Sequence, residues 1–349
     1  VAWRLLLVRR RARKAVQCDA ALDRLYRDLW DESPSMLVHY AKAMQRFGID
    51  GEDFERRVSK MRAEQSERAG VAMTYLLSDF QQLATQRTGM PDPTFMDMKT
   101  SFWEEGDPIG QHITCPRDGR LGCALVDWIP RHARRQQTHF MSWTWQYTLQ
   151  QVTSALGVFQ EGMDPAAADD VYFYVCFFVN NQHRIIIEGS MTGSGNLEEV
   201  FESNLRRIGR VVAILDTFEE PVYLKRVWTV FEQFKASTLQ IPVTFVMPRA
   251  AMRRLQEQVS LGRAGIRDIT QSVSRVDSAS AKAWKAEDEE KVKGMIRQTV
   301  GFAKVDEHVT KVMTRWIGDT MQDMFHELIS AARDEQTGQE GEELETWTF

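Results

Sequence analysis

The sequence predicts an α/β protein with a doubly wound, mostly parallel sheet between N-terminal and C-terminal helical regions. Between residues 138 and 247, short apolar runs alternate with segments of helical periodicity, which is the pattern of consecutive βαβ units. The central runs are apolar almost throughout, as expected of strands that helices cover on both faces. Outside this part of the chain, apolar residues recur at the spacing of amphipathic helices.

The expected modules follow one another along the chain. Breaks at 31–34 and 47–51 divide the N-terminal helices, since Gly and a capping Asp or Ser end one helix and start the next. Prolines and glycines make the following segment irregular, and the acidic composition of the last segment favours disorder. The modules are a helical region at 1–88, a linker with short strands at 89–135, an α/β domain at 136–280, helices at 281–333 and an acidic tail at 334–349.

Within the α/β domain, strands and helices alternate. The expected strands are 138–143, 171–179, 210–215 and 241–247, and the helices between them are 148–159, 197–208 and 223–236. Three more helices, 250–259, 281–300 and 307–332, and an edge strand near 266–276 complete the C-terminal part.

Composition excludes several classes of partner. With 44 basic and 49 acidic residues, the formal net charge of -5 offers no global attraction to nucleic acid or anionic lipid. No run approaches the roughly 18 apolar residues of a spanning helix, so no membrane span is expected. Four cysteines are too few for a disulfide framework in this chain, which favours a reducing, intracellular compartment such as the cytoplasm.

The first residues are rich in arginine and contain no acid before Asp19. One interpretation is a basic amphipathic helix at the edge of the helical region. The other is an organelle-targeting presequence, which such a composition resembles although serine is missing. The sequence does not say whether Val1 is a native or a processed start.

Two cysteines bracket a glycine-containing segment from Cys115 to Cys123. The first interpretation is a hairpin with a glycine turn and two ordinary thiols. The alternative is a metal site completed by His112, His132 or His139, although seven intervening residues is not the spacing of a zinc knuckle.

Polar and aromatic residues follow the predicted strands directly. In an open parallel sheet, ligands bind beyond the carboxyl ends of the strands, so these residues are candidates for a binding site. Tryptophan faces can stack on a nicotinamide or adenine ring, while amides and a carboxylate can bond a ribose or phosphate. The candidates are Ser142, Trp143, Trp145, Asn180, Asn181 and Asp216.

Each candidate also has a structural interpretation. The tryptophans could fill the core, with alternation along the strand end favouring burial of Trp143 and a ligand contact for Trp145. The asparagines could be turn residues that end a strand, and Asp216 could cap the next helix.

Three motifs resemble the TIR-like family of α/β domains. The segment His-Phe-Met-Ser-Trp-Thr-Trp, 139–145, resembles the first-strand motif of TIR domains. The segment 227–234 resembles their Trp-Cys-x-x-Glu helix motif, with Thr229 at the Cys position and the Trp-to-Glu spacing of four retained. Residues 174–182 resemble the strand-plus-Asn-Gln motif of the related HET domains, and similar sequences occur in algal protists. The resemblance covers about a third of the chain and implies a flavodoxin-like, TIR-like sheet.

The resemblance also implies an activity. In enzymatic TIR domains, the motif glutamate cleaves NAD at the bond between nicotinamide and ribose, and the matching residue is Glu232. NAD would then be a substrate and not a tightly bound cofactor, with Trp228 one helical turn before the carboxylate. TIR enzymes commonly act as assemblies, so self-association is expected. The alternatives are a noncatalytic TIR-like interaction module with protein partners and a structural subunit of a larger complex.

The start of the helix decides whether Glu232 can reach a site at the strand ends. A helix that began at Pro221 would place Glu232 about eleven residues, or roughly 16 Å, along its axis, which is too deep. Catalysis requires a start nearer Lys225. The competing interpretation of Glu232 is an exposed glutamate that pairs with Lys225 or Lys235.

Overall fold

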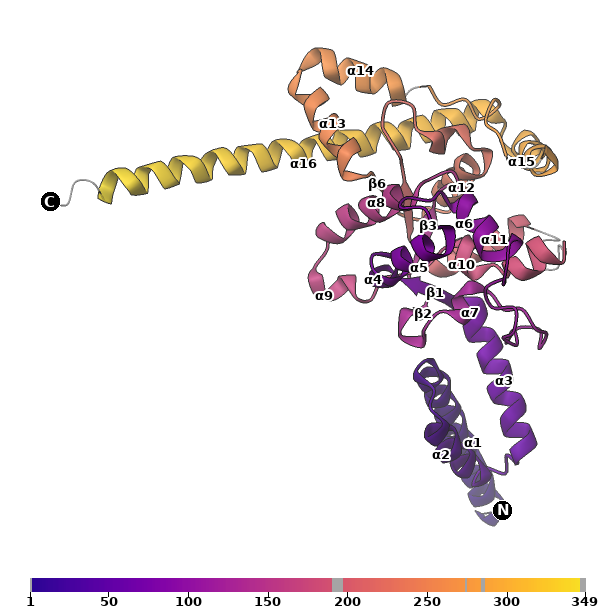
Figure 1. Ribbon diagram of the computed structural model, residues 1–349. Helices are drawn as coiled ribbons and strands as arrows, with labels where there is room; N and C mark the ends of the chain where they lie inside the picture. Colours follow the sequence, from indigo (N-terminus) through magenta and orange to yellow (C-terminus); the bar gives the residue numbers. More distant parts are fainter. Residues whose placement is uncertain (1, 190–196, 274, 284–285, 346–349) are drawn as a thin grey trace. The chain divides into compact units, whose positions relative to one another are not determined.

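The computed structural model describes residues 2–189, 197–273, 275–283 and 286–345 (Figure 1). It is an α/β structure with a six-stranded, mostly parallel sheet, as predicted. The strands hydrogen-bond in the order β2-β1-β4-β3-β5-β6. Two of the strands, β1 and β2, lie outside the four that the sequence predicts.

Contacts divide the chain into two compact units that each use two stretches of sequence. Unit 1 comprises residues 1–141 and 160–210, and unit 2 comprises residues 142–159 and 211–349. The units therefore alternate along the chain, whereas the sequence analysis expects modules in succession.

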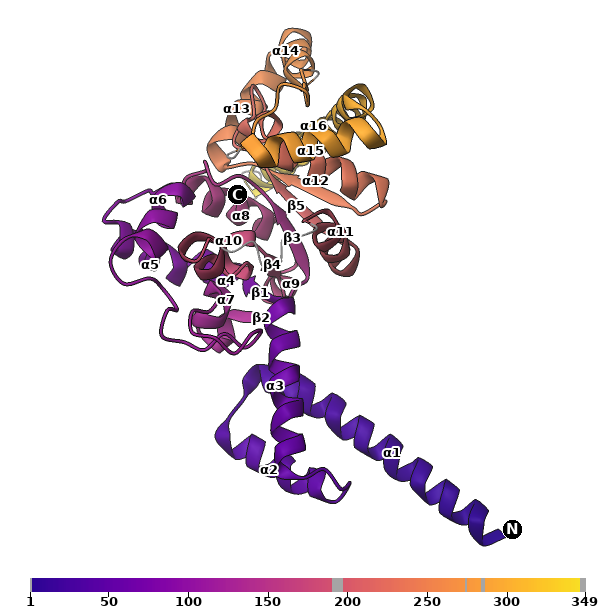
Figure 2. The same cartoon turned by 90° about the vertical axis from the view of Figure 1, so that its right-hand side faces the viewer.

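Unit 1 begins with three helices (Figure 2) and a short 3-10 turn. These elements share a hydrophobic cluster. The predicted breaks are confirmed. The Ser33 hydroxyl accepts the amide hydrogen of Met36 at 3.3 Å, and Asp50 accepts that of Asp53 at 2.8 Å, so both residues cap a helix. The elements are α1 Ala2–Asp28, η1 Leu29–Asp31, α2 Pro34–Gln45 and α3 Gly51–Arg68.

The expectation of an all-helical N-terminal region is wrong at β1, Ala69–Ala72. This strand pairs antiparallel with β2, Arg134–Gln136, and with β4, Tyr172–Tyr174. A Cβ on Gly70 would lie 2.9 Å from the Phe173 carbonyl oxygen, so only glycine fits this backbone approach. The four small residues of β1 give no periodic signal, which explains why the strand was missed.

The predicted strand 171–179 is only partly correct. After β4 the chain turns into α10, Cys176–Val179, while β4 pairs in parallel with β3, His139–Ser142. A short apolar run does not distinguish a strand from a buried helical turn. Here the tertiary structure decides, because the α10 side chains complete an aromatic cluster. Its members are Phe80, Phe95, Phe102, Trp103, Phe177 and Phe178.

The linker expected at 89–135 contains more helix than strand. Its elements, after α4 Met73–Leu76 and α5 Asp79–Thr88, are α6 Phe95–Lys99, the π-helix η2 Thr100–Glu104, α7 Leu125–Trp128 and η3 Arg131–Ala133, which leads into β2. Unit 1 also contains α9 Pro165–Ala168, the π-helix η4 His183–Ile187 and α11 Leu197–Ile208.

The hairpin interpretation of Cys115 to Cys123 is confirmed. Thr114 and Leu121 form an antiparallel bridge, and Gly119 has a φ of 72°, a left-handed conformation that favours glycine. Both cysteines are buried free thiols, and burial raises the pKa of Cys123 to about 12. Across the described ranges, no three His, Cys, Asp or Glu side chains are arranged to hold a metal ion.

Unit 2 contains the parallel pair β5, Val211–Ile214, and β6, Val243–Val246, in the register Val211 opposite Val243. Most predicted helices are confirmed, but the edge strand near 266–276 is wrong because α14 occupies this segment. Its apolar residues Ile266, Ile269 and Val273 recur at helical spacing, and α14 packs against α13 and α16. The helices are α8 Leu149–Glu161, α12 Val227–Thr238, α13 Arg249–Ser260, α14 Arg263–Val273, α15 Ala286–Thr299 and α16 Phe302–Glu345.

The last helix, α16, is longer than the predicted 307–332 (yellow in Figure 1). It includes most of the segment that was expected to be a disordered tail. Glutamate and glutamine are good helix formers, and the two glycines of this segment each cost only about 1 kcal/mol. In the part of the chain that the structure describes, no helix has both the length and the apolar character needed to cross a bilayer.

The aromatic cluster gives a first prediction. Phe177 is fully buried and lies 4.8 Å from Trp103 between ring centroids. We expect Phe177→Ala to lower the free energy of unfolding by about 3–5 kcal/mol, because it leaves a cavity among rigid rings. Denaturant titration measures the change. Leu121→Ala, at a 61% exposed position of the same unit, should change stability by less than about 0.5 kcal/mol, and an equal effect of both variants would contradict the packing argument.

Candidate functional site

The candidate site is built at the end of β3 and on α12, within unit 2. The 3-10 turn η5, Val222–Lys225, precedes α12, which begins at Val227. Glu232 is therefore the sixth residue of the helix, roughly 7.5 Å beyond its first residue. The helix start near Lys225 that catalysis requires is confirmed. Thr229, at the position of the motif cysteine, donates its hydroxyl to the carbonyl oxygens of Tyr223 and Arg226 and so fixes the junction between η5 and α12.

A chain of three hydrogen-bonded side chains leads to the Glu232 carboxylate. Gln233 Nε2 donates to the Tyr223 hydroxyl at 2.7 Å, and that hydroxyl lies 2.5 Å from Ser142 Oγ. Ser142 in turn donates to Glu232 Oε2. Because the Tyr223 oxygen accepts from Gln233, it is free to donate to Ser142, and every bond in the chain points toward the carboxylate.

Burial controls the protonation of this acid. Glu232 as a residue keeps partial solvent exposure, but its carboxyl group is surrounded by protein atoms. Burial raises the pKa of Glu232 to about 8, and the hydrogen bond from Ser142 opposes this rise only in part. Burial, followed by the neighbouring Glu232 carboxylate, also raises the pKa of Tyr223. At neutral pH both groups are mostly protonated.

The interpretation of Glu232 as an exposed, lysine-paired glutamate is wrong. Lys225 pairs with Glu220 at 3.0 Å, and Lys235 lies over the Phe231 ring at 5.5 Å from its centroid. Among the residues that the structure describes, Glu232 has no ion-pair partner and Ser142 is its hydrogen-bond partner. Glu232 is thus a desolvated carboxylate without a compensating cation, and such carboxylates are rare in proteins.

Three tryptophans lie near this site along the sequence, with different exposures. Trp143 is 7% exposed and Trp145 is partly exposed, in agreement with the alternation that favours burial of the first. Their rings are nearly parallel, at 11°, with centroids 6.3 Å apart. Trp228 is partly exposed and packs edge-on against Phe231. Trp145 and Trp228 therefore keep surface that a ligand could contact.

Asp216 follows β5 and organises the loop that leads to η5. It accepts the amide hydrogen of Val222 at 2.9 Å and a hydrogen bond from the Tyr147 hydroxyl at 3.3 Å. Tyr147 also donates to the Ile214 carbonyl oxygen at 2.9 Å. Burial raises the pKa of Asp216, while these hydrogen bonds oppose the rise. Asp216 thus binds the first amide of η5 from the preceding loop, although the N-cap residue of that turn is Pro221.

Asn180 and Asn181 belong to unit 1 and make local bonds there. Asn180 accepts from the Tyr174 hydroxyl at 3.2 Å. Asn181 donates to the Gly122 carbonyl oxygen at 3.0 Å and accepts the amide hydrogen of Arg184 at 3.3 Å. The Asn181 bonds tie the Cys115 hairpin to the segment after α10, and the local bonding of both asparagines favours their turn interpretation.

Comparison of the chain with family models, with curated proteins and with solved structures gave no match. The site must therefore be judged on its own geometry.

The sequence analysis missed Tyr223, Gln233 and Tyr147. Each is fully or almost fully buried, and each contributes a polar atom to the network around Ser142 or Asp216. Gln233 follows Glu232 directly, and Tyr223 stands in an apolar segment before the helix motif. A buried phenol requires a hydrogen-bond partner, which is the signal that could have drawn attention to these tyrosines.

This arrangement can supply a carboxyl group of unusually high pKa next to aromatic surface. Ser142 is 0% exposed and its hydroxyl is fully used within the protein, so it positions the carboxylate. As a neutral acid, Glu232 can donate a proton. As an anion, it can stabilise a positive charge in a place where water competes weakly.

The raised pKa predicts a pH dependence of stability. The folded protein retains the Glu232 proton up to about pH 8, while the unfolded chain loses it near pH 4.5, so the free energy of unfolding falls as pH rises across this window. At about 1.4 kcal/mol per pKa unit, the total is a few kcal/mol. Glu232→Gln should remove this contribution, and its stability relative to wild type should rise between these pH values.

Guanidinium titrations of both proteins at several pH values measure this difference. The control is Glu257→Gln, an exposed position on α13, which should follow the wild type at each pH. Parallel pH curves for wild type and Glu232→Gln would show that the carboxyl is not desolvated.

Proposed function

We propose that this protein is a TIR-like NAD glycohydrolase in which Glu232 is the essential carboxylate. The observation that carries the proposal is the hydrogen bond between Ser142 and Glu232. The first-strand motif and the helix motif, 90 residues apart along the chain, meet at this bond. Glu232 is the glutamate that matches the TIR helix motif. It is also a buried carboxylate with no cationic partner among the described residues.

The order of the strands supports the same proposal. The strands β3, β4, β5 and β6 can be numbered 1 to 4 in chain order. Their order across the sheet is then 2-1-3-4. Flavodoxin-like sheets have this order. Ser142 ends β3, and Asp216 follows β5.

The charge of the site favours a cationic ligand. The nicotinamide ring of NAD+ carries a positive charge, which would lower the pKa of Glu232 and ionise it when the ring lies close to the carboxylate. The reduced form, NADH, has a neutral ring and offers no such gain. An unpaired, desolvated carboxylate therefore selects the oxidised dinucleotide.

The reaction would follow from that electrostatic match. The bond between the ribose C1′ and the ring nitrogen breaks, and both electrons go to the nitrogen, so nicotinamide leaves as a neutral molecule. The ionised Glu232 stabilises the oxocarbenium-like ribose. Water then adds to C1′ and releases a proton, which yields ADP-ribose. Trp145 and Trp228 would form aromatic walls beside the dinucleotide.

Loss of the carboxylate is the direct test. Wild type, incubated with NAD+ at several protein concentrations, should release nicotinamide, measured by chromatography. Glu232→Gln should lower kcat by about 100-fold or more, because the amide keeps the shape but carries no charge. Glu257→Gln should match wild type. No release by wild type at any concentration, with the fold intact by circular dichroism, would end the glycohydrolase proposal.

The pH profile provides a second test. kcat/KM reports the free enzyme, in which Glu232 must lose a proton, so it should rise roughly tenfold for each pH unit below about 8. kcat reports the complex, in which the cationic ring has lowered this pKa, and should be flat near neutrality. Coincident profiles of both parameters would contradict the proposed pairing of carboxylate and nicotinamide.

A noncatalytic interaction module or structural subunit is the alternative. One observation favours it: Phe325 and Ile329 on α16, one turn apart, are 46% and 51% exposed. Light scattering of the full chain, with Phe325→Ser as the variant, tests whether this apolar surface supports self-association.

A further inference from the structure

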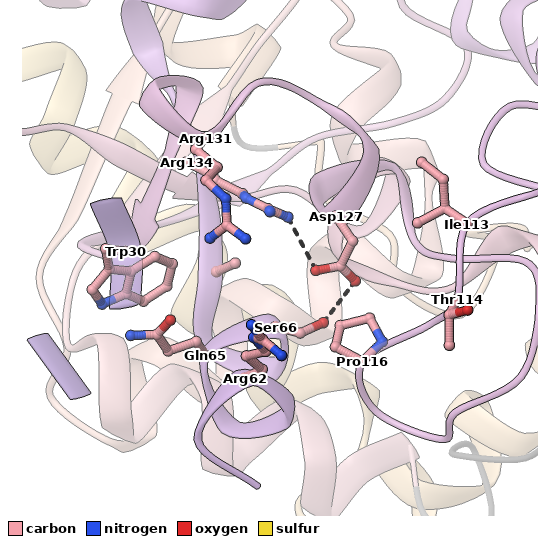
Figure 3. Close-up of a pocket in the computed structure, with 11 residues that line it drawn as sticks. Trp30, Arg62, Gln65, Ser66, Ile113, Thr114, Pro116, Asp127, Arg131 and Arg134 are labelled. Carbon is pink, nitrogen blue, oxygen red and sulfur yellow. Dashed lines mark hydrogen bonds and ion pairs between the residues drawn. The ribbon is translucent and has the colours of Figure 1, made fainter. Parts of the chain in front are cut away.

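Unit 1 contains a cavity of about 200 Å³ (Figure 3), whereas the Glu232 site belongs to unit 2. Residues from η1, α3, α7, η3 and β2 line it, together with the first arm of the Cys115 hairpin. Three arginines, Arg62, Arg131 and Arg134, line it together with one carboxylate, that of Asp127. Trp30 forms an aromatic wall (Figure 3).

The guanidinium groups are only partly neutralised. Arg62 and Arg131 both bond to Glu32, and Arg131 also donates to the Leu29 carbonyl oxygen at 3.2 Å. Arg134 Nη1 donates to Asp127 at 3.2 Å and to the Val126 carbonyl oxygen at 2.8 Å.

A fourth guanidinium, that of Arg117, adjoins the same cavity. Its Nε donates to Ser66 Oγ at 2.7 Å, and Ser66 donates to Asp127 at 2.7 Å. Arg62, Arg131 and Arg134 thus bond directly to two carboxylates, those of Glu32 and Asp127, and the fourth guanidinium reaches Asp127 only through Ser66. This surplus of positive charge borders the cavity, and the side chains of Arg62 and Arg131 also reach solvent, at 41% and 45% exposed.

Several donors of these arginines are unused by the chain. Within the described ranges, Arg134 Nε and Nη2, Arg131 Nε and Arg62 Nη1 make no hydrogen bond. The Arg134 side chain is only 15% exposed. Burial, with a contribution from the charge of Arg131, lowers the pKa of Arg134. An anion in the cavity would offset this repulsion and use the free donors.

We propose that this cavity binds a small phosphate monoester, with the phosphoryl group on Arg62, Arg131 and Arg134 and a planar substituent against Trp30. Guanidinium forks match the geometry of phosphoryl oxygens, and an aromatic face favours a flat group. A cavity of about 150 Å³ holds a benzene molecule, so about 200 Å³ leaves room for a ring and part of a phosphate. The site is independent of Glu232 and its activity.

The probes are inorganic phosphate, phenyl phosphate and phenol, titrated into the full chain by calorimetry at constant ionic strength. We expect saturable binding of both phosphates, tighter for phenyl phosphate, and none of phenol. Arg134→Gln should weaken both phosphates by at least about tenfold. Trp30→Ala should weaken phenyl phosphate more than inorganic phosphate.

Two further variants distinguish a site from general charge or damaged folding. Arg135→Gln removes the neighbouring arginine, which pairs with Asp31 and does not line the cavity, and should leave binding unchanged. Asp127→Asn removes the competing negative charge while its amide oxygen can still accept from Ser66, and should strengthen binding several-fold. An unfolded variant cannot bind more tightly. Three results would each overturn the proposal. They are the absence of saturable phosphate binding, an equal loss of affinity in Arg134→Gln and Arg135→Gln, and weaker binding by Asp127→Asn than by wild type.

Discussion

The hydrogen bond between Ser142 and Glu232 connects the end of β3 to the second turn of α12, and the polar interior of unit 2 is organised around it. Tyr223 lies between Ser142 and Gln233, so η5 is held to the same chain of donors. Thr229 anchors the junction between η5 and α12 through two carbonyl oxygens. Since none of these groups is a cation, the carboxylate keeps a high pKa, and the chemistry that we propose depends on that property.

The two sites have opposite electrostatic imbalance. Unit 2 holds a desolvated carboxyl without a positive partner, whereas unit 1 holds guanidinium groups in excess of their carboxylates. At neutral pH the carboxyl of unit 2 retains its proton, whereas the arginines of unit 1 stay charged without full compensation by the protein's own side chains. Such arrangements reduce stability, so they are more informative about ligands than well-paired surface ions are.

Much of the fold could be predicted because its signals are local. The apolar run at β5 and the capping residues Ser33 and Asp50 specify their elements without reference to distant residues. The strand β1 could not be predicted, since its position depends on pairing with β2 and β4. The same holds for the site. Spacing within one helix relates Trp228 to Glu232, but only tertiary structure reveals that Tyr223 and Gln233 complete the chain to Ser142, or that Asn180 and Asn181 serve local turns.

The alternation of the two units along the chain constrains how the protein can be divided. The backbone passes between them at residues 141–142, 159–160 and 210–211, so neither unit is a continuous stretch of sequence. Removing residues 1–141 would delete most of unit 1 and leave residues 160–210 of that unit inserted within unit 2. Removing residues 211–349 would delete most of unit 2 and leave residues 142–159 inserted within unit 1. A genetic exchange that transferred one unit intact would need several coordinated breakpoints, which ties the inheritance of the Glu232 site to that of the arginine-lined cavity.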